Sequence, residues 1–133
     1  MAKTYFVVTG IVMHNGKLLI LKKSDDDRNY PGCWGFCSGF VKEFEAAEDT
    51  VLREIKEETG LDASITKEGG LIKVKDAALA KNWAIMAFLC SAADDKVGLD
   101  HENSEYKWIT REEIGNYKFV PGLIEDLKSV GII

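Results

Sequence analysis

The segment REIKEETG, residues 53–60, holds three glutamates whose spacing could serve chemistry. Glu54, Glu57 and Glu58 are three or four residues apart or adjacent, so they share one surface if the segment is helical. Like charges three or four residues apart destabilise a helix by about 0.2–0.5 kcal/mol per pair, and acids in a last turn oppose the helix dipole. The requirements of folding alone therefore do not explain this arrangement.

A divalent cation would explain the three glutamates directly. Oxygen donors without His or Cys suit Mg²⁺ or Mn²⁺, which bind through a few carboxylates while substrate phosphates complete the coordination. The alternative is a solvated charged face on which Arg53 offsets Glu57 and Lys56 points to water. The charge pattern by itself favours the two interpretations equally.

A helix from about Ala46 to Thr59 is expected to position these glutamates. Its apolar residues Ala47, Val51 and Ile55 recur every four residues, which predicts a stripe that faces the core. Gly60 follows at the position where a left-handed residue ends many helices.

The remaining elements predict a mixed sheet covered by helices on both faces. Tyr5–Met13 and Lys17–Lys23 are expected to pair through the Asn-Gly turn between them. Further strands are expected at Trp34–Val41, Leu71–Lys75, Trp83–Cys90 and Tyr106–Ile109, and short helices from Thr110 and from near Pro121. Because these strands and helices do not alternate strictly, they indicate an α/β (α+β) protein rather than a doubly wound parallel sheet.

Length and composition narrow the class of protein further. The 133 residues suffice for one globular domain, and the net charge of −5 argues against a nucleic-acid polymer or an anionic membrane as partner. No apolar stretch is long enough to span a membrane, and no signal peptide is expected. Cys33, Cys37 and Cys90 have irregular spacing, which indicates reduced thiols in a cytoplasmic protein.

Residues 39–61 resemble the Nudix box of the Nudix hydrolases. Gly39 is followed after five residues by Glu45, and after seven more by REIKEETGL, so every defining position of the box is matched. The flanking elements are also similar to the order in that family. The resemblance implies one Nudix domain over residues 1–133, folded as an α/β/α sandwich with a mixed β-sheet.

The resemblance also implies metal-dependent hydrolysis of a nucleoside diphosphate linked to another group. In that interpretation Glu54, Glu57 and Glu58 bind or serve Mg²⁺ or Mn²⁺. A backbone carbonyl ligand would fall at Ser38 or Gly39. Metal ions would neutralise the phosphate oxygens and activate water.

The residue that takes the proton from water has candidates inside and outside the box. Inside it the candidates are Glu54 and Glu57, which we favour because they share a rigid helix with the expected ligands. Outside it they are Glu105 and then Glu102, in the segment HENSEYKW. An exposed surface position is the alternative for Glu105.

Two further residues of the box are expected to support the glutamates. The resemblance implies that Glu45 supports the site and that Arg53 orients the glutamates through charge-assisted bonds.

Two stretches depart from the family pattern. Phe36–Gly39 stands where Pro-Gly-Gly usually precedes the box, and Phe44 stands where a glycine usually precedes Glu45. Because side chains obstruct conformations that glycine permits, these departures predict an altered loop.

Substrate contacts are predicted only weakly. Arg28 could reach a phosphate, and Trp34 or Trp83 could stack on a nucleobase. The alternatives are a solvated loop cation for Arg28 and core positions for both tryptophans.

The expected function is that of a small MutT-type enzyme acting on a nucleoside triphosphate or a related nucleotide. The alternatives are an ADP-ribose or nucleotide-sugar hydrolase, a Nudix-fold module that senses nucleotides without cleaving them, and an acidic interaction protein. The expected partner is a small-molecule nucleotide, and the chain is expected to be a monomer or a homodimer.

Overall fold

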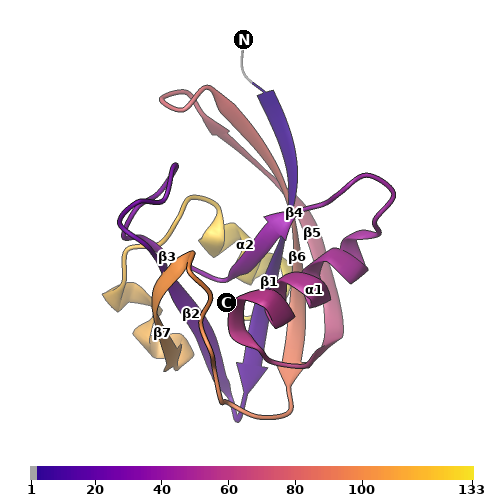
Figure 1. Ribbon diagram of the computed structural model, residues 1–133, viewed down its shortest axis with the longest axis vertical. Coiled ribbons are helices and arrows are strands. Elements are labelled where there is room, and N and C mark those ends of the chain that lie inside the picture. The colour runs from indigo at the N-terminus through magenta and orange to yellow at the C-terminus, as the bar shows by residue number, and fades with distance from the viewer. Residues whose placement is uncertain (1–2) are drawn as a thin grey trace.

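The computed structural model describes residues 3–133 and contains a mixed sheet of seven strands (Figure 1). The strand order is β3-β2-β1-β6-β5, with β4 added to β1 and β7 added to β2. The strands are β1 (Lys3–His14), β2 (Lys17–Lys23), β3 (Trp34–Gly35), β4 (Cys37–Phe40), β5 (Ala63–Asp76), β6 (Lys81–Ala92) and β7 (Asn103–Ile109). Strands β1 and β6 are parallel, and the other paired strands are antiparallel. The predicted mixed sheet is confirmed.

Helices cover both faces of this sheet. Helix α1 (Ala47–Thr59) lies in front of it in Figure 1, and α2 (Leu123–Ser129) lies behind it with the 3-10 helix η1 (Arg111–Asn116). Alternate residues of β1 explain the two cores, since Val8 packs with α1 and Ile11 packs with α2. The expected α/β/α sandwich is confirmed.

The expected ends of the helices agree closely with the structure. Helix α1 begins one residue later than expected, and Gly60 adopts a left-handed φ of 76° while its N–H donates to the Lys56 carbonyl at 2.9 Å. The Thr110 N–H donates to the Glu113 carboxylate at 3.0 Å at the start of η1. The other short helix, α2, begins at Leu123, two residues beyond Pro121.

Two expected strands differ from the structure. The segment Trp34–Val41 contains two short strands, because β3 pairs with β2 whereas β4 pairs with residues 7–10 of β1. Beyond the β1–β2 turn, β2 pairs with β7, so β4 occupies the edge of β1 that β2 leaves. The strand expected at Leu71–Lys75 is part of the longer β5, which follows β6 through a register shift between Glu68 and Leu71.

Cys33, Cys37 and Cys90 are buried free thiols. Among the described residues, no helix is long and apolar enough to cross a membrane.

Helix α1 approaches the sheet closely over Gly10 of β1. A Cβ atom at position 10 would lie 2.9 Å from both Ile55 Cδ1 and Val51 Cγ2. Both of these α1 residues are fully buried. The missing side chain therefore sets the depth at which α1 is seated on the sheet.

We expect Gly10→Val to lower the free energy of unfolding by about 1–3 kcal/mol, because the added methyl groups overpack the contact with Val51 and Ile55. Urea denaturation of the purified protein measures this change. Gly98→Ala is the matched control, since a Cβ at Gly98 meets no atom within 4 Å. Equal stability of Gly10→Val and the wild type would show that the close approach is not required.

Candidate active site

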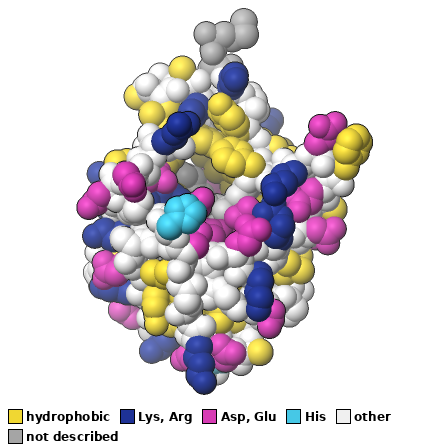
Figure 2. All heavy atoms as spheres, viewed as in Figure 1, with side chains coloured by type: hydrophobic (Ala, Val, Ile, Leu, Met, Phe, Trp, Pro, Cys, Tyr) yellow, Lys and Arg dark blue, Asp and Glu magenta, His cyan; other side chains and the backbone are white. Residues whose placement is uncertain are grey.

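A cavity of about 550 Å³ opens on the face of the molecule that carries α1 and β4. Figure 2 shows this face, with hydrophobic side chains on one side of the hollow and charged side chains on the other. The lining comes from β1, β4, α1, β6, the end of β2 with the loop that follows it, the loop at 101–102, and α2 with the segment that leads into it. Segments far apart in the sequence therefore meet at one site.

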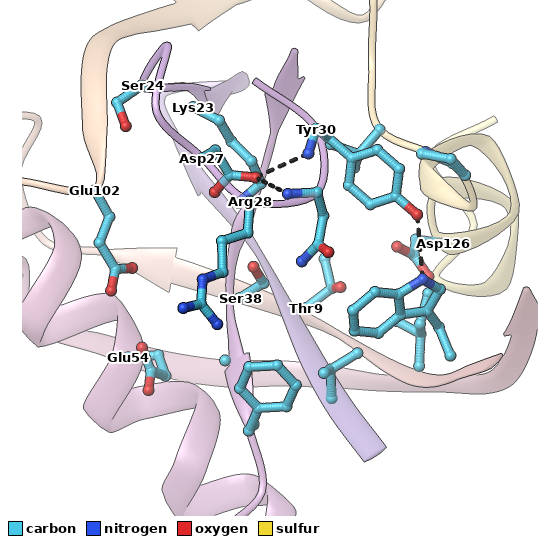
Figure 3. A pocket seen from close by; sticks show the side chains of 18 of the residues that line it. Thr9, Lys23, Ser24, Asp27, Arg28, Tyr30, Ser38, Glu54, Glu102 and Asp126 are labelled. Atoms are coloured by element: carbon cyan, nitrogen blue, oxygen red, sulfur yellow. Dashed lines mark hydrogen bonds between the residues drawn. The ribbon is translucent and has the colours of Figure 1, made fainter. Parts of the chain in front are cut away.

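The two ends of the cavity differ in chemistry (Figure 3). Glu54 and Glu102 lie at one end, and Tyr30 and Asp126 lie at the other. Arg28 reaches toward the acidic end. A ligand that fills the cavity would thus meet carboxylates at one end, the Arg28 guanidinium between the ends, and a mainly apolar wall at the other end.

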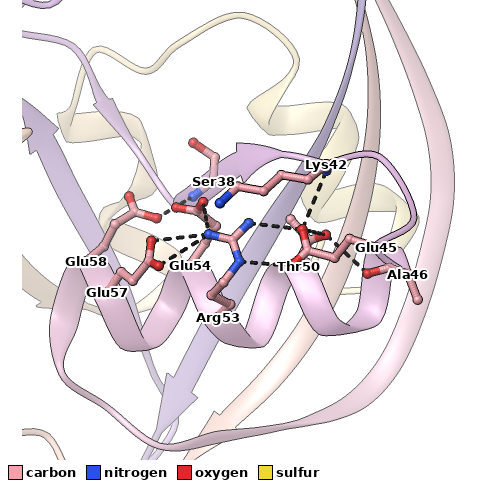
Figure 4. A network of polar contacts seen from close by, with 9 residues as sticks. All are labelled: Ser38, Lys42, Glu45, Ala46, Thr50, Arg53, Glu54, Glu57 and Glu58. Atoms are coloured by element: carbon pink, nitrogen blue, oxygen red, sulfur yellow. Dashed lines mark hydrogen bonds and ion pairs between the residues drawn. The ribbon is translucent and has the colours of Figure 1, made fainter.

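Arg53 binds three glutamates at the acidic end (Figure 4). Its guanidinium contacts both carboxylate oxygens of Glu45, with Nε at 2.9 Å and Nη2 at 3.0 Å. Its Nη1 donates to Glu54 at 2.9 Å and to Glu57 at 3.2 Å. Hydrogen bonds from Arg53 and from the Thr50 hydroxyl lower the pKa of Glu45 to about 2. The guanidinium therefore holds the carboxylates of Glu45, Glu54 and Glu57 together.

Glu58 lies beside Glu57 and Glu54, at the end of this network away from Glu45 (Figure 4), and is 3% exposed. Its carboxylate accepts a hydrogen bond from the Ser38 N–H at 3.2 Å. Burial, with the negative charge of Glu54 adding to it, raises the pKa of Glu58 well above its usual range. Burial also raises the pKa of Glu54, although Arg53 opposes the rise. Both carboxylates lack full charge compensation within the protein, which is the condition that a bound cation relieves.

Gly39 makes room for the Glu54 carboxylate. A Cβ at position 39 would overlap the carboxyl group of Glu54, so a side chain there would displace it. Gly39 and Ser38 belong to β4, which passes beside α1. The glycine of the box thus acts here by leaving space for a functional group.

The donors of this region fit a hard divalent cation. Glu54 and Glu58 meet against Gly39 and Ser38, and all of their donor atoms are oxygens. Within residues 3–133 no cluster of three potential ligands is already assembled, and both Glu54 and Glu57 accept hydrogen bonds from Arg53. Binding through Glu57 would therefore require its carboxylate to leave the guanidinium.

The departures from the family pattern leave this arrangement in place. Phe44 adopts the left-handed conformation with φ 62°, and its side chain is fully exposed. A non-glycine residue in this conformation costs about 1–2 kcal/mol, but Glu45 still reaches Arg53. Burial raises the pKa of the Cys37 thiol well above its usual range, which accords with a packing role.

The weaker candidates for substrate contacts differ in whether they line the cavity. Arg28 lines it, whereas Trp34 is buried in the core beside Tyr117, with ring centroids 5.3 Å apart. The tryptophan that lines the cavity is Trp83. The Trp34 side chain therefore does not line this cavity, so it is not placed to stack on a base bound there.

The two downstream acids also occupy different places. Glu102 lines the cavity, and its charge contributes to the raised pKa of Glu54. Glu105 lies on β7 opposite Lys22 and is half-exposed, with its carboxylate 3.9 Å from Lys22 Nζ. The structure thus brings Glu102 to the site and leaves Glu105 on the surface.

Hydrogen bonds fix the wall at the far end of the cavity. The Trp83 indole N–H donates to the Tyr30 hydroxyl at 3.1 Å, and that hydroxyl donates to Asp76 at 3.0 Å. Lys81 Nζ donates to the Asn29 side chain at 2.6 Å. The loop that carries Arg28 is therefore attached to β5 and β6.

Asp126 is a cavity residue that the sequence analysis missed. It is 4% exposed, and its position three residues after Leu123 places it beside the buried stripe of α2. Burial raises the pKa of Asp126 to about 7, with Glu125 adding to the rise and a hydrogen bond from Thr9 opposing it. An acid on an otherwise apolar helical stripe is the signal that could have found it.

Comparisons with known proteins agree with this geometry. A family model described as NUDIX domain matches residues 4–127, so the chain belongs to the NUDIX family. Nucleoside triphosphatase NudI of Escherichia coli is 26% identical over 136 residues, covering 96% of both chains. The predicted identity as a Nudix pyrophosphohydrolase is confirmed.

Solved structures of the same family have the same fold. A MutT protein from Methanosarcina mazei Go1 is similar with a TM-score of 0.82 and 25% identity, covering 94% of this chain and 90% of that one. The NUDIX domain of Shewanella oneidensis NrtR, solved as a complex with ADP ribose, has a TM-score of 0.79 and 18% identity. That match covers 95% of this chain and 85% of the other and bears on the fold alone.

The raised pKa of Asp126 predicts a dependence of stability on pH. Between about pH 4 and pH 7 the folded protein keeps a proton on Asp126 that the unfolded chain has lost, so the free energy of unfolding falls as pH rises. At about 1.4 kcal/mol per unit, the loss amounts to a few kcal/mol. Asp126→Asn should remove this part of the slope and be more stable than the wild type at pH 8.

Urea denaturation from pH 4.5 to pH 8 in metal-free buffer measures this difference. Glu58 and the other acids contribute to both proteins, so the difference between the two curves isolates Asp126. The control is Glu125→Gln, which removes an exposed carboxylate from the same helix and should keep most of the slope. Parallel curves for the wild type and Asp126→Asn would contradict the raised pKa.

Proposed function

We propose that this protein hydrolyses a nucleoside triphosphate to a nucleoside monophosphate and pyrophosphate, with Mg²⁺ or Mn²⁺ as cofactor. The observation that carries the proposal is a cavity with carboxylates at one end and an apolar wall at the other. The phosphates of a nucleotide suit the acidic, cation-binding end, and its base suits the apolar end. The family and the triphosphatase relative support the same reaction class.

In this proposal the cation is held by Glu54, Glu57, Glu58 and the Gly39 backbone. When bound, Mg²⁺ or Mn²⁺ supplies charge neutralisation at the phosphate oxygens and makes water more acidic. Arg53 keeps Glu54 and Glu57 oriented in the absence of the cation. Lysine could not replace its planar set of donors.

The protein's own groups are then assigned to binding and proton transfer. Lys23 and Arg28 line the cavity and bind phosphate oxygens. A glutamate accepts the proton of the attacking water, and we place this base within the box, at Glu54 or Glu57. Glu102 is the downstream acid whose position suits the same task, and Glu105 remains the other downstream candidate.

Two other functions of the same fold differ from this proposal in the compound cleaved or in the absence of cleavage. A hydrolase of ADP-ribose or of a nucleotide sugar would use the same acidic end. A sensing module would bind a nucleotide without cleaving it, and the complete set of box carboxylates favours turnover over sensing.

The first test is a product assay over nucleoside triphosphates, ADP-ribose and nucleotide sugars with and without Mg²⁺. We expect a nucleoside triphosphate to yield monophosphate and pyrophosphate only with the cation present. Glu58→Gln should reduce turnover by at least a hundredfold, while its metal-free form unfolds at the same or a higher temperature than the wild type, because a buried carboxylate is removed. Cleavage of ADP-ribose alone, or of no compound, would contradict the proposal.

The second test locates the proton acceptor by comparing two single substitutions at saturating Mg²⁺. If the base lies in the box, Glu102→Gln and Glu105→Gln should each retain turnover within about tenfold of the wild type. If a downstream acid is the base, its substitution should reduce turnover by roughly 10²–10⁴ without a rescue by added metal. The position of Glu105 opposite Lys22 leads us to expect near wild-type turnover for Glu105→Gln.

A further inference from the structure

Arg28 lies in a turn whose backbone is fixed by its neighbours. The Asp27 carboxylate accepts hydrogen bonds from the N–H groups of Asn29 at 3.1 Å and of Tyr30 at 2.9 Å. Such bonds from an Asp side chain to the backbone two or three residues later stabilise a tight turn. The turn therefore sets the direction in which the Arg28 side chain leaves the backbone and enters the cavity (Figure 3).

The guanidinium of Arg28 is not held by an acid of the protein. Among residues 3–133, the ion pairs have Lys22, Arg53 and Lys56 as their cations, and none of them involves Arg28. A binding group is kept in place by the contacts of the residues around it when its own side chain is free. The orientation of this cation toward a ligand therefore depends on the turn at residues 27–30.

The same turn is attached to the hairpin of β5 and β6 by two side chains. The Tyr30 hydroxyl donates to Asp76 at 3.0 Å and accepts the Trp83 indole N–H at 3.1 Å. The Asn29 side-chain oxygen accepts a hydrogen bond from Lys81 Nζ at 2.6 Å. The partners are 46 to 53 positions apart in the sequence. One side of the turn is therefore held against the sheet by long-range contacts.

The contact between Tyr30 and Asp76 joins groups that are themselves fixed. The other Asp76 carboxylate oxygen accepts the Leu79 N–H at 3.1 Å, in the turn between β5 and β6. Trp83 is buried, so its indole N–H requires the Tyr30 hydroxyl as an acceptor. Burial, with the hydrogen bond to Asp76 adding to it, raises the pKa of the Tyr30 phenol, which stays protonated and donates at neutral pH. A hydroxyl with both partners fixed determines where its ring lies.

We propose that Tyr30 and Asp76 are positioning residues that hold Arg28 where it binds the phosphates of the nucleotide. The inference rests on the nucleotide site proposed above and names the contacts on which its phosphate-binding cation depends. A mobile turn would have to be ordered when the ligand binds, which weakens binding. When only a fraction of the molecules holds a binding group in place, the apparent affinity falls by that fraction. The hydrogen bond from Tyr30 to Asp76 keeps this fraction high.

A purely structural role for the two residues leads to different kinetics. If Tyr30 and Asp76 only fasten the hairpin of β5 and β6, their loss lowers the temperature of unfolding and leaves nucleotide binding unchanged. If they position Arg28, their loss raises KM while kcat is retained, because phosphate contacts made equally in the ground state and the transition state are weakened. The two roles are therefore separated by KM and kcat.

The test measures kcat and KM for dATP, dCTP, dGTP and dTTP at saturating Mg²⁺ in Tyr30→Phe, Arg28→Ala and the double variant. We expect Tyr30→Phe to raise KM about fivefold and to keep kcat within about twofold of the wild type. In the Arg28→Ala background the same substitution should change KM by less than about twofold, because the residue that it positions is absent. An equal effect of Tyr30→Phe with and without Arg28 would overturn the inference.

Two more variants separate the effect on KM from a loss of stability. Asp76→Ala keeps the bond between Trp83 and Tyr30 and should also raise KM, so the test does not depend on the folding of Tyr30→Phe. Thr66→Val is the matched control, since the Thr66 hydroxyl links β5 to the Leu89 carbonyl of β6 at 3.0 Å and Thr66 does not line the cavity. It should keep the wild-type KM. An equal rise of KM in Thr66→Val would overturn the inference.

A binding measurement separates this inference from the proposed hydrolysis. Titration calorimetry with inorganic tripolyphosphate and Mg²⁺ reports phosphate binding without a nucleoside. Binding that is about fivefold weaker in Tyr30→Phe, but unchanged by this substitution in the Arg28→Ala background, supports the inference even if no nucleotide is cleaved. Cleavage of nucleotides with the wild-type KM in both Tyr30→Phe and Asp76→Ala overturns the inference and leaves the proposed hydrolysis standing.

Discussion

The close seating of α1 on the sheet is the constraint on which the site depends. Gly10 of β1 leaves room for Val51 and Ile55, and Gly39 of β4 leaves room for the Glu54 carboxylate. Because these contacts fix both the depth and the rotation of the helix, the glutamates of its next face are brought against β4. A helix held farther from the sheet would lose the hydrogen bond between the Ser38 N–H and Glu58.

The charges of the site are arranged with incomplete compensation. Arg53 satisfies Glu45 and contacts Glu54 and Glu57, so the folded helix tolerates neighbouring acids that would otherwise repel one another. Glu58 remains buried, with the Ser38 N–H as its hydrogen-bond donor. Burying such a group opposes stability, and a cation would relieve the cost. The acidic end is therefore built for a ligand rather than for maximal stability.

The remote end of the cavity also contains a buried carboxyl group whose charge is not compensated by a cation. Asp126 is buried without a cationic partner, and the apolar residues around it cannot supply a donor. The Tyr30 hydroxyl and its partners hold the nearby wall in place. Glu54 at the acidic end and Asp126 at the remote end, each with a pKa raised by burial, thus mark where the polar parts of a bound molecule would lie.

The sequence by itself determined the features that depend on neighbours along the chain. The helix that ends before Gly60, its apolar stripe and the grouping of Glu54 with Glu57 and Glu58 follow from spacings of three and four residues. Tertiary structure alone decided that Glu102 rather than Glu105, and Trp83 rather than Trp34, line the cavity. These choices depend on strand pairing and on loops that bring distant segments together, which local spacing does not encode. Asp126 reaches the site for the same reason, because the packing of α2 against the sheet determines what its buried stripe meets.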